Sequence, residues 1–105
     1  MAKDDYHVIV YMILKYLYQC LKNGIDVEQF EILNIIGELP KTYADYIIEA
    51  LHTEGHVEGV YPITAGGEEV YRLTPETRIT PKGIEYLNND EYMHKVKKYL
   101  NTHTK

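Results

Sequence analysis

The chain has 105 residues, 45% of them hydrophobic, and its 11 basic and 16 acidic residues give a formal net charge of −5. These values indicate one small globular domain, and the acidic balance argues against a surface built mainly for nucleic acid. The chain has no serine and one cysteine, Cys20, which excludes a serine nucleophile, an intramolecular disulfide and a multi-cysteine zinc site.

The first predicted element is a long amphipathic helix over residues 5–22, ended by Asn23-Gly24. Its apolar face collects residues spaced three and four apart: Tyr6, Ile9, Ile13, Tyr16, Leu17 and Cys20. Cys20 is therefore expected to be a small buried side chain rather than a reactive thiol. No apolar run reaches the roughly 18 residues of a membrane span and no signal peptide is visible, so we expect no membrane association and a cytoplasmic location.

Two shorter helices are predicted next, over residues 28–36 and from 41 or 42 to 55, joined by a tight turn at Gly37 to Pro40. Asp26 is the expected N-cap of the first of them, whose predicted buried side is Phe30, Leu33 and Ile36. Thr42 and Asp45 suggest a capping box for the second, with Pro40 in its first turn as the alternative. Its predicted buried side is Ala44, Ile47, Ile48 and Leu51.

The spacing of apolar residues then changes from a helical to an alternating pattern. Residues 56–61 and 70–73 predict a β-hairpin with a flexible tip around Ala65-Gly66-Gly67. Thr80 is the predicted N-cap of a helix over residues 81–88, which carries Pro81 at its first position and buries Ile84 and Leu87. A last helix is expected over residues 91–101, with its apolar face on Tyr92, Val96 and Tyr99, flanked by Met93 and Leu100.

This order of elements predicts an α+β fold, mostly α: a winged helix-turn-helix with a C-terminal helical extension. The helix-turn-helix covers about residues 28–55, the wing about 56–74 and the C-terminal helices about 81–101. A chain this small has room for one core. That core is expected to join Ile9, Ile13, Leu17, Leu33, Ile36, Ile47, Ile48, Leu51, Leu73, Ile84 and Leu87.

Two stretches flank the predicted hairpin, E-G-H-V-E-G-V at 54–60 and I-T-P-K-G-I-E-Y-L at 79–87. Through them the chain resembles the YjcQ family, small phage-associated winged-helix proteins of bacteria, over most of its length. The resemblance implies a winged helix from a bacterial or phage setting with a regulatory or assembly role. It brings no activity and no site residues to this chain.

DNA binding is the first functional hypothesis, because the second helix of a helix-turn-helix enters the major groove. The residues that could touch DNA are Lys41, Thr42, Tyr46, Thr53, Arg72, Arg78, Lys95 and Lys98. However, Asp45 and Glu49 lie on the same outward face as Thr42 and Tyr46, and carboxylates next to phosphates weaken binding.

Docking on a protein, including a second copy as a homodimer, is the rival hypothesis. The chain has 11 tyrosines, a residue enriched at interfaces. Tyr11, Lys15, Tyr18 and Lys22 form one stripe of the first helix, roughly opposite its apolar face. The alternative interpretation of this stripe is a solvated helix surface, or tyrosines covered by the C-terminal helix.

A metal site is weakly suggested by His52 and His56, which are four residues apart. Gly55 interrupts the helix between them and no third ligand is evident, so two histidines near a helix end are the simpler interpretation. We therefore predict no metal, no cofactor and no catalytic residue. The sequence leaves DNA and a protein partner undecided as the target of a non-enzymatic module.

Overall fold

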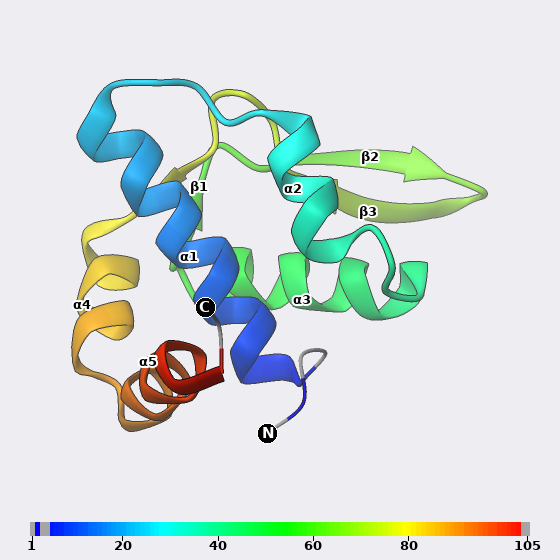
Figure 1. The fold of residues 1–105 in the computed structure, drawn as a ribbon. Helices are drawn as coiled ribbons and strands as arrows, with labels where there is room; N and C mark the ends of the chain where they lie inside the picture. The colour runs from blue at the N-terminus through cyan, green and yellow to red at the C-terminus, as the bar shows by residue number, and fades with distance from the viewer. Residues whose placement is uncertain (1, 3–4, 104–105) are drawn as a thin grey trace.

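Five helices make up most of the described chain, which comprises residue 2 and residues 5–103 of a computed structural model. They are α1 (Tyr6–Asn23), α2 (Gln29–Ile36), α3 (Lys41–Thr53), α4 (Pro81–Asn89) and α5 (Glu91–His103). In Figure 1, α1 lies between α4 and α5 on one side and α2, α3 and a β-hairpin on the other, and it contacts all four other helices. With its small antiparallel sheets the fold is α+β and mostly helical, as predicted.

The first helix confirms the sequence-based prediction to within one residue. It ends at Asn23 because Gly24 adopts the left-handed conformation, with φ of 66°, and its N–H reaches the carbonyls of Cys20 and Leu21. Eight of its 18 residues are buried, and Ile13 and Leu14 among them have no exposed surface. Cys20 is 3% exposed and packs as a core residue.

The second helix turns a different face inward from the one predicted. Ile32 is buried at 1% exposure, whereas Phe30 is 69% and Leu33 is 52% exposed, so the prediction that Leu33 belongs to the core is wrong. The helix follows a loop anchored by Val27 N–H, which donates to the Pro75 carbonyl at 3.1 Å, and α2 then packs on α1 with Ile32 in the core. Asp26 is not the N-cap, because α2 follows Glu28 and has no side-chain cap.

The third helix starts at the predicted Lys41 but is capped differently, and it ends at Thr53, two residues before the predicted end. Pro40 occupies the N-cap position and no side chain caps the helix, so the predicted Thr42–Asp45 capping box is wrong. Asp45 instead accepts from Lys41 one turn earlier, at 2.9 Å. Its buried residues are those predicted: Ala44, Ile47, Ile48 and Leu51.

The strands form two separate two-stranded sheets rather than one hairpin. β1 (Val57–Glu58) pairs with β4 (Arg78–Ile79), and β2 (Tyr61–Ala65) pairs with β3 (Glu68–Arg72). The predicted pairing of 56–61 with 70–73 holds only where Tyr61 faces Arg72. Gly66 and Gly67 both have positive φ, which suits a two-residue turn and sets this register.

Gly59 separates the two sheets. Its φ is 77°, and a Cβ there would lie 2.7 Å from the Glu76 carbonyl oxygen, so the chain bends and closes tightly against residues 74–77. The buried Thr77 hydroxyl donates to the Gly59 carbonyl at 3.0 Å, which holds this bend in place.

The C-terminal helices close the core over α1. Thr80 caps α4 as predicted, accepting from Gly83 N–H at 3.0 Å, and Leu87 is buried. In α5 Val96, predicted on the apolar face, and Met93, predicted at its flank, are each 0% exposed, whereas Tyr92 is 51% exposed, so its predicted place on that face is wrong. The remaining predicted core residues are buried, apart from Ile36 and Ile84, which pack at the core's edge.

Within the described residues, none of the helices combines the length and the apolar character that a bilayer crossing needs.

Candidate functional site

The outward face of α3 is the surface that a helix-turn-helix would present to DNA. Thr42, Tyr46 and Thr53 are exposed on it, Tyr46 by 64%. Lys41 is the one lysine or arginine of the helix, and its Nζ pairs with the Asp45 carboxylate at 2.9 Å. Because Glu49 is exposed as well, this face carries more negative than positive charge.

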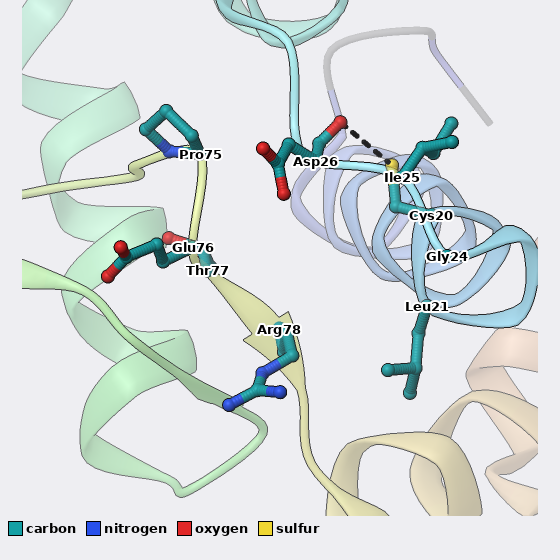
Figure 2. Close-up of a pocket in the computed structure, with 9 residues that line it drawn as sticks. All are labelled: Cys20, Leu21, Gly24, Ile25, Asp26, Pro75, Glu76, Thr77 and Arg78. Atoms are coloured by element: carbon teal, nitrogen blue, oxygen red, sulfur yellow. Dashed lines mark hydrogen bonds between the residues drawn. The ribbon is translucent and has the colours of Figure 1, made fainter.

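The two candidate arginines do not lie in one wing. Arg72 is exposed at the end of β3, whereas Arg78 belongs to β4 in the other sheet. Arg78 lines a hollow of about 370 Å³ between the end of α1 and residues 75–78, together with Asp26 and Glu76 (Figure 2). Carboxylates therefore accompany this arginine in the same hollow.

The candidate lysines of α5 lie on a third part of the molecule. Lys95 is held by Glu91 at 3.5 Å and over the Tyr92 ring at 5.4 Å, and Lys98 is exposed. The helix α5 packs on α1 and α4. The residues predicted to touch nucleic acid therefore lie on three parts of the molecule: α3, the small strands and α5.

The predicted partner stripe on α1 is partly covered. Tyr11 is only 6% exposed, and burial raises the pKa of its hydroxyl, so this side chain offers little surface to a partner. Tyr18 is half-buried, while Lys15 and Lys22 are exposed. Their ammonium groups lie over the two rings, Lys15 at 5.9 Å from the Tyr11 centroid and Lys22 at 4.4 Å from that of Tyr18.

Between this stripe and the C-terminal helices lies a hollow of about 250 Å³, here named the α1–α5 hollow. It is lined by Tyr11, Lys15, Tyr18, Gln19, Lys22, Leu87, Asn88, His94, Lys97 and Asn101. No carboxylate is among these described lining residues. The sequence shows the Lys15–Lys22 stripe and the basic character of α5 separately, but nothing in it indicates that they face each other.

A second hollow of about 520 Å³ adjoins the first and shares Tyr11, Lys15, Gln19 and Asn101 with it. We name it the α1–α2 hollow. Its remaining wall is mostly apolar, from Met12, Tyr16, Ile35 and Leu100, with Glu31 and Asn34 on the α2 side. The two hollows lie side by side along α1: the α1–α5 hollow forms a basic end and the α1–α2 hollow forms a more apolar end.

His52 and His56, the two histidines whose spacing weakly suggested a metal site, each contact a tyrosine ring. His52 lies 4.8 Å from the Tyr71 ring, and His56 stacks on Tyr86 at 4.5 Å. Burial lowers the pKa of His56, although Glu54, 3.4 Å away, opposes this, and burial raises the pKa of Tyr86 to about 12. Among residues 2 and 5–103, no three His, Cys, Asp or Glu side chains gather as metal ligands would.

A family model described as YjcQ protein matches residues 11–103, which is nearly the whole chain. This chain belongs to the YjcQ family. The match confirms the resemblance seen in the sequence, and it spans every residue of the α1–α5 hollow, from Tyr11 to Asn101. Comparison of this YjcQ protein with curated proteins and with solved structures finds no match.

Proposed function

We propose that this YjcQ protein is a winged-helix interaction module that docks on another protein, and that its helix-turn-helix does not read duplex DNA. The order α1, α2, α3 and hairpin supports the winged helix, with a short turn between α2 and α3 and β3 packed against α3. Its role is that of a non-enzymatic adapter of bacterial or phage origin, with a regulatory or assembly role in the cytoplasm.

The observation that carries this proposal is the charge on the outward face of α3. Duplex DNA is held by several Lys or Arg contacts to phosphates. Here Lys41 is neutralised by Asp45 at 2.9 Å, and Glu49 adds an exposed negative charge one turn further on. A phosphate approaching α3 would lose its water without gaining a cation.

Exposed apolar side chains support docking on a protein. Phe30 and Leu33 on α2 are 69% and 52% exposed, and Tyr46 on α3 is 64% exposed. Adjacent exposed apolar side chains are typical of interaction surfaces, and Phe30 and Leu33, three residues apart, are neighbours on α2.

The test measures binding of a labelled generic DNA duplex by fluorescence anisotropy at several salt concentrations. We expect no binding by the wild-type protein and weak binding by the double variant Asp45→Asn with Glu49→Gln, because Lys41 then becomes free. One recruited phosphate contact would give a slope of log K against log salt of about −0.9. The matched control, Glu28→Gln with Glu85→Gln, makes the same charge change away from α3 and should not bind.

The contrary result is also specific. If the wild-type chain binds the duplex with a steep salt dependence and the Asp45→Asn, Glu49→Gln variant loses that binding, the two carboxylates read cytosine amino groups in the major groove. The helix-turn-helix would then be a DNA reader, and the proposed docking function would be wrong.

A further inference from the structure

The α1–α5 hollow gathers positive charge on a chain whose formal net charge is −5. Lys15 and Lys22 are seven residues apart on α1, which places both on one face two turns apart. Lys97 reaches the same hollow from α5. Within residues 2 and 5–103, no carboxylate pairs with any of these three lysines.

Aromatic rings position two lysine ammonium groups of this hollow, and a hydrogen bond to the backbone fixes a histidine ring beside them. The Lys22 ammonium lies 4.4 Å from the centroid of the Tyr18 ring, and Lys15 lies over Tyr11. His94 is fixed by its Nε2, which forms a hydrogen bond with the Asn88 carbonyl oxygen. The site therefore presents preplaced positive charges, which reduces the entropy lost when an anionic ligand binds.

The neighbouring α1–α2 hollow extends the site with apolar surface. Met12, Ile35 and Leu100 form its walls, while Glu31 lies on its α2 side. A ligand that fits both hollows carries negative charge at one end and an apolar group at the other. Glu31 determines which way round such a ligand binds, because its negative charge repels a ligand carboxylate from the apolar end of the site.

We infer that the two hollows together bind a short acidic segment of a partner protein, a step that rests on the proposed docking function. Its carboxylates lie against Lys22 and Lys97, and an apolar side chain next to them enters the α1–α2 hollow. A nucleic-acid strand fits less well, because single strands are held by exposed aromatic faces on which bases stack. Here Tyr11 is 6% exposed, and Lys22 lies over the Tyr18 ring.

The experiment uses a fluorescein-labelled peptide that contains a run of glutamates beside two leucines, titrated with the full-length chain. We expect Lys22→Glu with Lys97→Glu to weaken binding by about tenfold or more, since close charge pairs at interfaces contribute that much. The matched control, Lys41→Glu with Lys82→Glu, makes the same charge change on α3 and α4 and should change the affinity less than about twofold. A peptide with glutamine in place of glutamate should bind weakly to every form.

All four lysines are exposed, so circular dichroism should show the variants folded. Equal peptide binding by the wild-type and Lys22→Glu, Lys97→Glu proteins, or no binding, would overturn the inference and leave docking to another surface. Duplex DNA bound only when Lys22 and Lys97 are intact would also overturn it and make the hollow a phosphate site. Self-association that depends on these two lysines would overturn it in favour of a second copy. Duplex DNA bound equally by wild-type and hollow variants, but altered by Asp45→Asn, would contradict the proposed function instead.

Discussion

Alanine substitutions on the two faces of α2 directly test which face of this helix packs into the core. Ile32 is 1% exposed and Leu33 is 52% exposed, although they are neighbours in the sequence. Replacing Ile32 with alanine removes buried methyl groups and leaves a cavity, which costs about 2–5 kcal/mol. Replacing Leu33 removes a side chain that is already half in water, so the loss of burial is about 1 kcal/mol at most, and the better helix propensity of alanine offsets part of it.

Urea unfolding of the two variants, followed by circular dichroism, measures both free energies of unfolding. We expect Ile32→Ala to lower the unfolding midpoint clearly with little change in the denaturant dependence, and Leu33→Ala to remain close to wild type. Equal destabilisation by the two substitutions would mean that Leu33 belongs to the core. It would also remove Leu33 from the exposed apolar side chains that support docking on a protein.

Three further predictions concern single sites. Gly83→Ala should destabilise the fold by about 1–3 kcal/mol in urea unfolding, because a Cβ there would lie 2.2 Å from the His56 carbonyl oxygen, whereas the exposed Glu85→Ala control should not. Burial lowers the pKa of His56 below its ordinary 6.5, so stability should fall as pH drops through 6.5, and His56→Gln should flatten that dependence; an unchanged slope would contradict it. Amide exchange should be fastest among internal segments at Gly66-Gly67, and strong protection there would refute a flexible hairpin tip.

The sequence alone was sufficient for elements whose signals are local. The start of α4 is decided by Thr80, Pro81 and the Gly83 N–H within four residues, and the end of α1 by Gly24 in the left-handed region. Periodicity over a helix as long as α1 also identifies its buried face, because many turns average out single exceptions. Membership of the YjcQ family could be read from the motifs around the hairpin in the same way.

Tertiary structure decided the features that depend on distant parts of the chain. In α2 apolar residues lie on almost every side of two turns, so the packing of α2 on α1 decides that Ile32 is the buried residue. The β1–β4 pair joins segments about twenty residues apart, which no local pattern connects. The α1–α5 hollow exists because α5 packs back on α1 and brings Lys97 opposite Lys22, a long-range contact that the spacing of residues along one helix does not encode.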